Sequence, residues 1–251
     1  ALGVALFERV GRGLVLTPTG RDLLEQVRAM GVAAERVSLL ASGRSQAIEG
    51  PIRISASEVT AAYLLPPAVA RIRAAHPGIT VEIVATNRRA DLLRREADIA
   101  IRHGETTDPE LIARRLGEDR ARPYATPECL ARLGRPRRWA DLAAAPFVGL
   151  DLTGALIAGV RPLGLHLTER NFPVGADSHL VHWAFVRAGA GIGLITEAVG
   201  DAEPGVVRVL PEEPPVRFPV WLVTHRELHM SRRIRVVFDL LAEALRPDGG
   251  P

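Results

Sequence analysis

Eight polar side chains stand where predicted strands end and predicted helices begin, the region in which open α/β sheets bind ligands. They are Ser57, Glu58, Thr60, Asn87, Arg102, Asp151, Asp177 and Ser178. Helix starts present free N–H groups, and hydroxyl, amide and guanidinium groups can fix the oxygen atoms of a small ligand. We therefore expect five loops to converge on one cleft that binds a small polar metabolite, with Arg102 binding its carboxylate.

Each of these side chains also has a purely structural interpretation. Ser57, Asp177 and Ser178 can cap helices without binding a ligand, and Arg102 can pair with Glu58 or Asp98. Glu58 argues against an acidic ligand, because like charges repel each other in a cleft. The sequence leaves both interpretations open for every one of these residues.

The sequence contains no recognisable catalytic or metal-binding motif. It lacks the G-x-S-x-G, H-E-x-x-H and phosphate-loop patterns, and the histidine pairs at 179/182 and 225/229 have no third ligand nearby. The glycine-rich segment 189–193 follows a predicted helix and precedes a strand, which is the reverse of a dinucleotide-binding fingerprint. We interpret it as a helix end and a tight turn, and we predict no enzymatic activity, no cofactor and no metal.

Composition indicates a globular protein of ordinary charge. The 251 residues are 47% hydrophobic with a formal net charge of +3, and every basic residue is an arginine. A net charge this small does not by itself indicate nucleic-acid binding. Cys129 is the only cysteine, which excludes an intrachain disulfide and fits a reducing cytoplasm. No apolar run reaches the roughly 18 residues that a membrane span needs.

The first twenty residues predict a β-hairpin. Val10 and residues 14–16 are β-type, Gly11 and Gly13 allow a tight turn, and Thr17-Pro18 is typical of a helix start. Arg9 and Arg12 would lie on or near the hairpin tip. A heptad seam then runs through residues 21–48 at Leu23, Val27, Met30, Ala34, Val37 and Ala41. This spacing favours a helix that pairs with another helix over one that lies on its own domain.

From residue 51 the pattern alternates between strands and helices, which predicts βαβ units with a parallel sheet. Strands are expected at 52–56, 79–84, 98–102, 147–150, 172–176, 192–195, 206–210 and 220–224. The main helices are expected at 60–75, 88–95, 127–133, 178–188 and 231–245.

These segments resemble LysR-type transcriptional regulators. The pattern L-G-x-x-L-F-x-R followed by L-T-x-x-G, at residues 2–9 and 16–20, resembles the end of their winged helix-turn-helix. The segments Ile52-Arg53-Ile54, Leu65-Pro66, His76-Pro77 and Asp98–Arg102 resemble the first lobe of their effector domain.

The resemblance implies an α/β fold: a two-lobed, periplasmic-binding-protein-like effector domain, preceded by a linker helix and the wing of a winged helix-turn-helix. The expected boundaries are 1–20 for the wing, 21–48 for the dimerising linker helix, 51–125 with 219–251 for lobe I, and 126–218 for lobe II. The base-reading helix would lie before Ala1, so Arg9 and Arg12 are the expected DNA contacts.

The resemblance implies a cytoplasmic bacterial regulator that, as a full-length homodimer or homotetramer, binds promoter DNA and senses a small polar, anionic metabolite. A solute-binding protein of a transporter shares the two-lobed fold and is the alternative. No membrane partner is expected.

Overall fold

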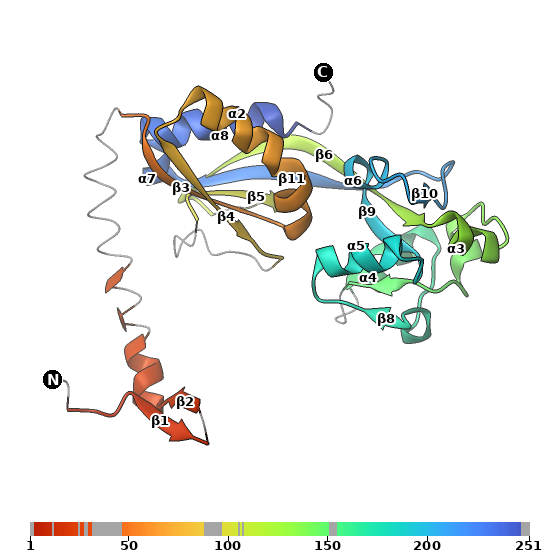
Figure 1. Cartoon of the computed structure of the whole chain (residues 1–251), viewed down its shortest axis with the longest axis horizontal. Coiled ribbons are helices and arrows are strands. Elements are labelled where there is room, and N and C mark those ends of the chain that lie inside the picture. The colour runs from red at the N-terminus through yellow and green to blue at the C-terminus, as the bar shows by residue number, and fades with distance from the viewer. Residues whose placement is uncertain are drawn as a thin grey trace.

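The computed structural model describes residues 3–11, 13–24, 26–27, 30–31, 47–87, 97–104, 106, 108–150 and 155–246 (Figure 1). The predicted Arg12 contact, the predicted helix at 88–95 and the site residue Asp151 lie outside these ranges. So does most of the 32–48 part of the predicted linker helix. Within the described part of the chain, no helix has the length and apolar character needed to cross a bilayer.

The predicted N-terminal hairpin is confirmed. Strands β1 (Phe7–Val10) and β2 (Gly13–Leu16) pair antiparallel, with Phe7 opposite Leu16. The Thr17 hydroxyl accepts a hydrogen bond from the Gly20 N–H at 2.9 Å, which caps the helix that begins at residue 18.

The first lobe is built on a mixed sheet, in which the three strands predicted at 52–56, 79–84 and 98–102 are parallel, as the sequence indicates. Its strands are β3 (Gly50–Ala56), β4 (Ile79–Ala85), β5 (Ile99–His103), β6 (Leu111–Ala125) and β11 (Val216–His225). The order is β4-β3-β5-β11-β6, and the first three strands are parallel whereas β11 runs antiparallel to both β5 and β6.

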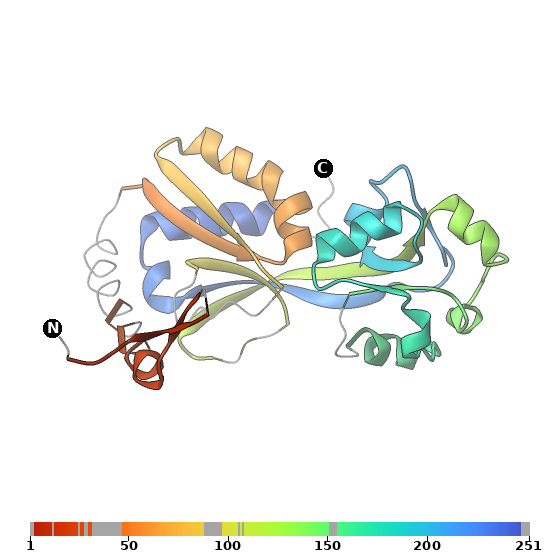
Figure 2. The same cartoon turned by 60° about the horizontal axis from the view of Figure 1, so that its bottom comes forward.

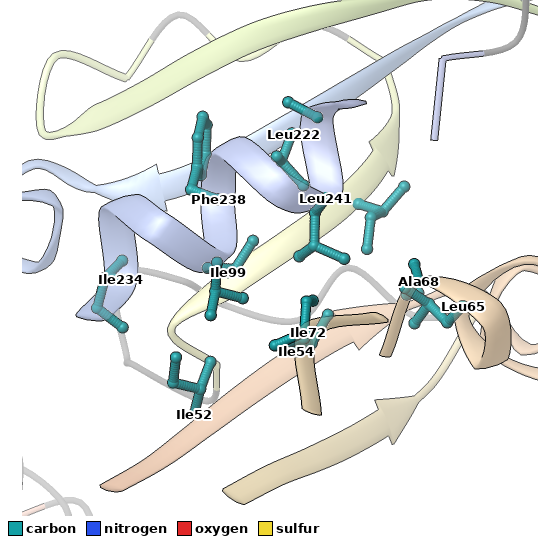
Figure 3. Packing of buried hydrophobic residues seen from close by; sticks show 14 of the residues in the cluster. Ile52, Ile54, Leu65, Ala68, Ile72, Ile99, Leu222, Ile234, Phe238 and Leu241 are labelled. Atoms are coloured by element: carbon teal, nitrogen blue, oxygen red, sulfur yellow. The ribbon is translucent and has the colours of Figure 1, made fainter. Parts of the chain in front are cut away.

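One face of this sheet is covered by two helices, α2 (Leu65–Ala75) and α8 (Arg232–Ala244), with a short π-helical segment, η1 (Thr60–Leu64), leading into α2. Their apolar faces and the sheet form one buried core (Figure 3). Ile54 on β3, Ile72 on α2 and Leu241 on α8 are at most 1% exposed. This packing explains why α8 returns to the first lobe although it ends the chain.

The second lobe is assembled around the far halves of the same two long strands. Strand β6 continues into it and pairs with β9 (Gly193–Thr196) and β10 (Val207–Arg208), and a separate parallel pair is formed by β7 (Val148–Gly149) and β8 (Val174–Gly175). The helices are α3 (Pro127–Arg132), α4 (Ala155–Val160), α5 (His179–Arg187) and α6 (Glu197–Gly200). One short helix, α7 (Arg226–His229), follows β11. Because β6 and β11 run through both lobes (Figures 1 and 2), they are the physical connection between them.

Candidate functional site

The loop that joins β3 to η1 is closed by its own hydroxyl groups. Ser57 Oγ and Thr60 Oγ1 lie 2.9 Å apart, and the Thr60 N–H donates to Ser57 Oγ at 3.3 Å. Ser57 therefore acts as a helix cap, one of the two interpretations that the sequence left open. Thr60 is 5% exposed.

Glu58, in the same loop, reaches across to the second lobe. Its Oε2 atom accepts hydrogen bonds from Ser178 Oγ at 2.8 Å and from the His179 N–H at 2.7 Å, at the first turn of α5. The Glu58 N–H donates to Asn87 Oδ1 at 3.2 Å. Figure 2 shows η1 and α5 facing each other at this junction. Three of the five predicted loops therefore meet here, at residues 57–60, 87 and 178.

The environment of Glu58 favours its charged form. Burial raises the pKa of this carboxyl, but hydrogen bonds from Ser178, Asn87 and the backbone at His179 outweigh burial and leave the pKa below its ordinary value. Ser178 also accepts from the Val181 N–H at 3.5 Å, so it caps α5 while it donates to Glu58. A carboxylate at this helix start is electrostatically well placed.

Arg102, at the end of β5, is directed to the neighbouring strand. Its Nη2 donates to Ser55 Oγ at 3.1 Å and its Nη1 donates to the Ile101 carbonyl at 2.9 Å. Ser55 is fully buried. Asp177 is exposed beside Ser178, and Arg9 is exposed on β1.

A cavity of about 680 Å³ opens between the lobes, and Thr60 is the only predicted site residue among those that line it. First-lobe residues on its wall include Tyr63 and His103, whereas Asp119 comes from β6, Glu197 from α6 and Asp201 from the position directly after α6. Its lining also includes apolar side chains such as Ile101, Val220 and Leu245. Apolar walls with a few polar groups are typical of sites for small molecules.

Arginines neutralise two of the carboxylates on the second-lobe wall. Glu197 pairs with Arg122 of β6, which also donates to the Leu210 carbonyl at 3.4 Å. Asp201 accepts from Tyr124 Oη and from Arg208 Nε, both at 2.8 Å. The Arg208 hydrogen bond holds the pKa of Asp201 below its ordinary value, whereas burial and Asp201 raise that of Tyr124. This network fixes α6 against β6.

Histidines also gather at the junction. A positive charge on the His179 ring would disfavour a positive charge on His103 and on His182. Burial lowers the pKa of His182, which is 1% exposed, to about 4, so this ring is neutral at pH 7. Among the described residues, no group of three or more His, Cys, Asp or Glu side chains is arranged to hold a metal ion.

The family model described as the LysR substrate binding domain matches residues 45–246. The chain belongs to the LysR-type transcriptional regulators. It is 28% identical over 256 residues to the HTH-type transcriptional regulator CrgA of Neisseria meningitidis serogroup C, a match that covers 97% of this chain and 83% of CrgA. It is 29% identical over 251 residues to the uncharacterised HTH-type regulator YeiE of Escherichia coli K12, covering 95% of this chain and 82% of YeiE. The structure of CrgA from N. meningitidis matches with a TM-score of 0.69 at 27% identity, covering 96% and 84% of the two chains.

Membership in the LysR family confirms the two-lobed, periplasmic-binding-protein-like fold and the regulator function predicted from the sequence, with its effector-sensing domain. Apart from Thr60, the sequence did not reveal the cavity-lining side chains of this LysR regulator. Asp119 and Glu197 lie on elements that became adjacent only through strand pairing between β6 and β9. The sole local signal was the unusual density of arginines and carboxylates between residues 114 and 122.

Proposed function

We propose that a small polar metabolite, bearing a carboxylate or another oxygen-rich group, binds between the two lobes of this regulator and changes how it holds promoter DNA. The observation that supports this most directly is the contact from Glu58 to Ser178 and His179, because it joins the lobes through residues of the predicted cleft. A ligand that binds one arrangement of the lobes better than another shifts the balance between them.

The proposed ligand-binding residues are those predicted from the sequence. They are Ser57, Glu58, Thr60, Asn87, Arg102, Asp151, Asp177 and Ser178. Arg102 would bind the carboxylate, and the hydroxyl and amide groups would fix other oxygen atoms. The cavity bordered by Thr60 offers space for the rest of the molecule.

We also propose how the wing, the linker helix and the two lobes are arranged in the full regulator. The wing at residues 1–20 would place Arg9 and Arg12 near DNA phosphates, and residues 21–48 would pair two chains into a homodimer or part of a homotetramer. Residues 51–125 with 219–251, and residues 126–218, would form the two lobes of the effector domain. Such a regulator would act in the cytoplasm and would not catalyse a reaction.

A thermal-shift panel of small carboxylates, amines and sugars tests this proposal. A ligand that binds only the native state raises stability by about 2.7 kcal/mol at 100 times its Kd. For a carboxylate that raises Tm, calorimetry should show Arg102→Ala weakening binding by about 1.5–3 kcal/mol, the worth of a hydrogen bond to a charged group.

Arg114→Ala is the matched control, because Arg114 pairs with Asp239 on the surface at 3.2 Å. Equal affinities for the two variants would place the ligand elsewhere.

A further inference from the structure

Glu58 does more than line the predicted cleft. We propose that Glu58 is the residue that sets the charge preference of the effector site, because its carboxylate occupies the hydrogen-bonding position that an anionic effector would use on the second lobe. An anionic effector then binds by displacing Glu58, and this displacement releases the lobes from each other. The inference rests on the proposed function, since it concerns the same interlobe site.

The contact between the lobes, which we call the brace, has a polar part from Glu58 and an apolar part from Val59. Glu58 supplies the polar part, with both hydrogen bonds directed to one oxygen at 2.8 and 2.7 Å. Its neighbour Val59 supplies the apolar part: it is 5% exposed and belongs to the second-lobe core around Trp183 of α5 and Tyr124 of β6. A first-lobe loop is thus anchored in the second lobe by two adjacent side chains.

The loop is held in this geometry from its own side as well. Asn87 accepts the Glu58 N–H, and the Ser57 and Thr60 hydroxyls bond to each other. Because the loop backbone is fixed at both ends, the Glu58 carboxylate is positioned before any ligand arrives. An interaction formed from fixed groups loses little conformational entropy on formation and is strong for its size.

The charge of a ligand determines whether it can bind at the Ser178 and His179 donors beside Glu58. The Ser178 hydroxyl and the His179 N–H have one hydrogen each to donate, and Glu58 Oε2 accepts both. A second carboxylate would find these donors occupied and a negative charge beside it. It can bind there only when Glu58 moves away, whereas a neutral or positively charged ligand would not need to displace Glu58.

Two variants test the two sides of this contact. Glu58→Gln keeps the length and an acceptor oxygen but removes the charge, and Ser178→Ala removes one of the two donors. Glu82→Gln is the matched control, because Glu82 pairs with Arg53 at 2.9 Å on the exposed side of β4 with a side chain 59% exposed.

The first measurement needs no ligand. Hydrogen exchange of the peptide 176–187 in the full chain should be faster by about tenfold at the first amides of α5 in Glu58→Gln, because a locally weakened contact opens more often. Glu82→Gln should leave this exchange unchanged. Unchanged protection in Glu58→Gln would overturn the brace.

The second measurement uses the carboxylates of the thermal-shift panel as probes, among them acetate, malonate, succinate and benzoate. The probe that binds should bind Glu58→Gln about five- to tenfold more tightly than the unmodified protein and bind Ser178→Ala more weakly. Equal or weaker binding by Glu58→Gln overturns displacement. Binding by neither protein overturns displacement and the carboxylate effector together, and the exchange result still decides the brace.

Discussion

The ion pair between Arg122 and Glu197 should be among the most important polar contacts for the stability of the described chain. The two side chains are only 12% and 18% exposed. Arg122 also donates to backbone carbonyls between Leu210 and Glu213, so it connects β6, α6 and the segment after β10. Replacing it by Met preserves most of the apolar stem and removes every one of these donors.

The expected loss of stability follows from the Glu197 charge that stays buried when Arg122 is replaced. Removing one partner of a buried pair costs about 3–5 kcal/mol, because the other charge stays desolvated. Here Arg208 lies 3.6 Å and Arg120 3.9 Å from the Glu197 carboxylate, so part of its charge remains compensated. We therefore expect Arg122→Met to lower the free energy of unfolding by about 2–3 kcal/mol. For a chain of this size, this is a fall in Tm of about 4–12 °C.

Urea unfolding followed by circular dichroism measures the loss. Arg114→Met is the control, because the Arg114–Asp239 pair has side chains 43% and 69% exposed and should lose less than about 1 kcal/mol. The double variant Arg122→Met with Glu197→Gln should recover part of the loss, since it removes the stranded charge. Equal losses for Arg122→Met and Arg114→Met would refute the reasoning, and no recovery would show that packing rather than charge was responsible.

Three further changes test other parts of the second lobe. A Cβ at Gly193 would lie 2.3 Å from Val186 Cγ2, so Gly193→Ala should destabilise the protein by about 1–3 kcal/mol, whereas Gly159→Ala, with open space around it, should not. Tyr124→Phe removes the hydrogen bond to Asp201 and should cost about 1–2 kcal/mol, seen as a lower urea midpoint. The pKa of His182 falls from an unfolded value near 6.5 to about 4 in the folded protein, so the unfolded state binds more protons as the pH falls below 7. The free energy of unfolding should therefore decrease by about 2 kcal/mol between pH 7 and pH 5. A free energy of unfolding that stays constant over this range would contradict this.

Local patterns predicted the elements that have one buried face. The alternation at residues 52–56 became β3, where Ile52 and Ile54 are fully buried, and the apolar stripe of residues 231–245 became α8. The start of α5 was predicted from Ser178, which caps it. These signals work because burial on one side of an element imposes a period on the sequence.

The long strand β6 was missed for a physical reason. Its register to β11 shifts at a bulge between Val220 and Trp221, so the period of two that identifies a strand is broken. Its charged residues pair across the surface instead, as Arg115 does with Glu118. The sequence predicted the parallel arrangement of β3, β4 and β5 but not the antiparallel strands beside them. The pairing of β11 with β5 joins segments about 120 residues apart and has no local signature.

The candidate site shows the same limit. The sequence identified Ser57, Glu58, Asn87 and Ser178 as polar groups at helix starts, and the structure brings all four to one junction. It could not show that Glu58 would be bonded to Ser178, because 120 positions separate them. The carboxylate that argued against an acidic ligand in the sequence also forms a contact between the lobes.

Displacement of Glu58 also determines which parts of the effector would supply the free energy of binding. An effector carboxylate can take over the hydrogen bonds from Ser178 and His179. The free energy it gains is about equal to the free energy lost when Glu58 leaves, since the effector carboxylate and Glu58 are both charged acceptors. The exchange is then close to neutral, and a ligand shifts an equilibrium only by its differential affinity for the two states. The driving free energy must therefore come from the attraction between Arg102 and the carboxylate, and from the rest of the effector in the cavity beside Thr60. On this reasoning the carboxylate releases the lobes, and the remainder of the molecule determines which metabolite is recognised.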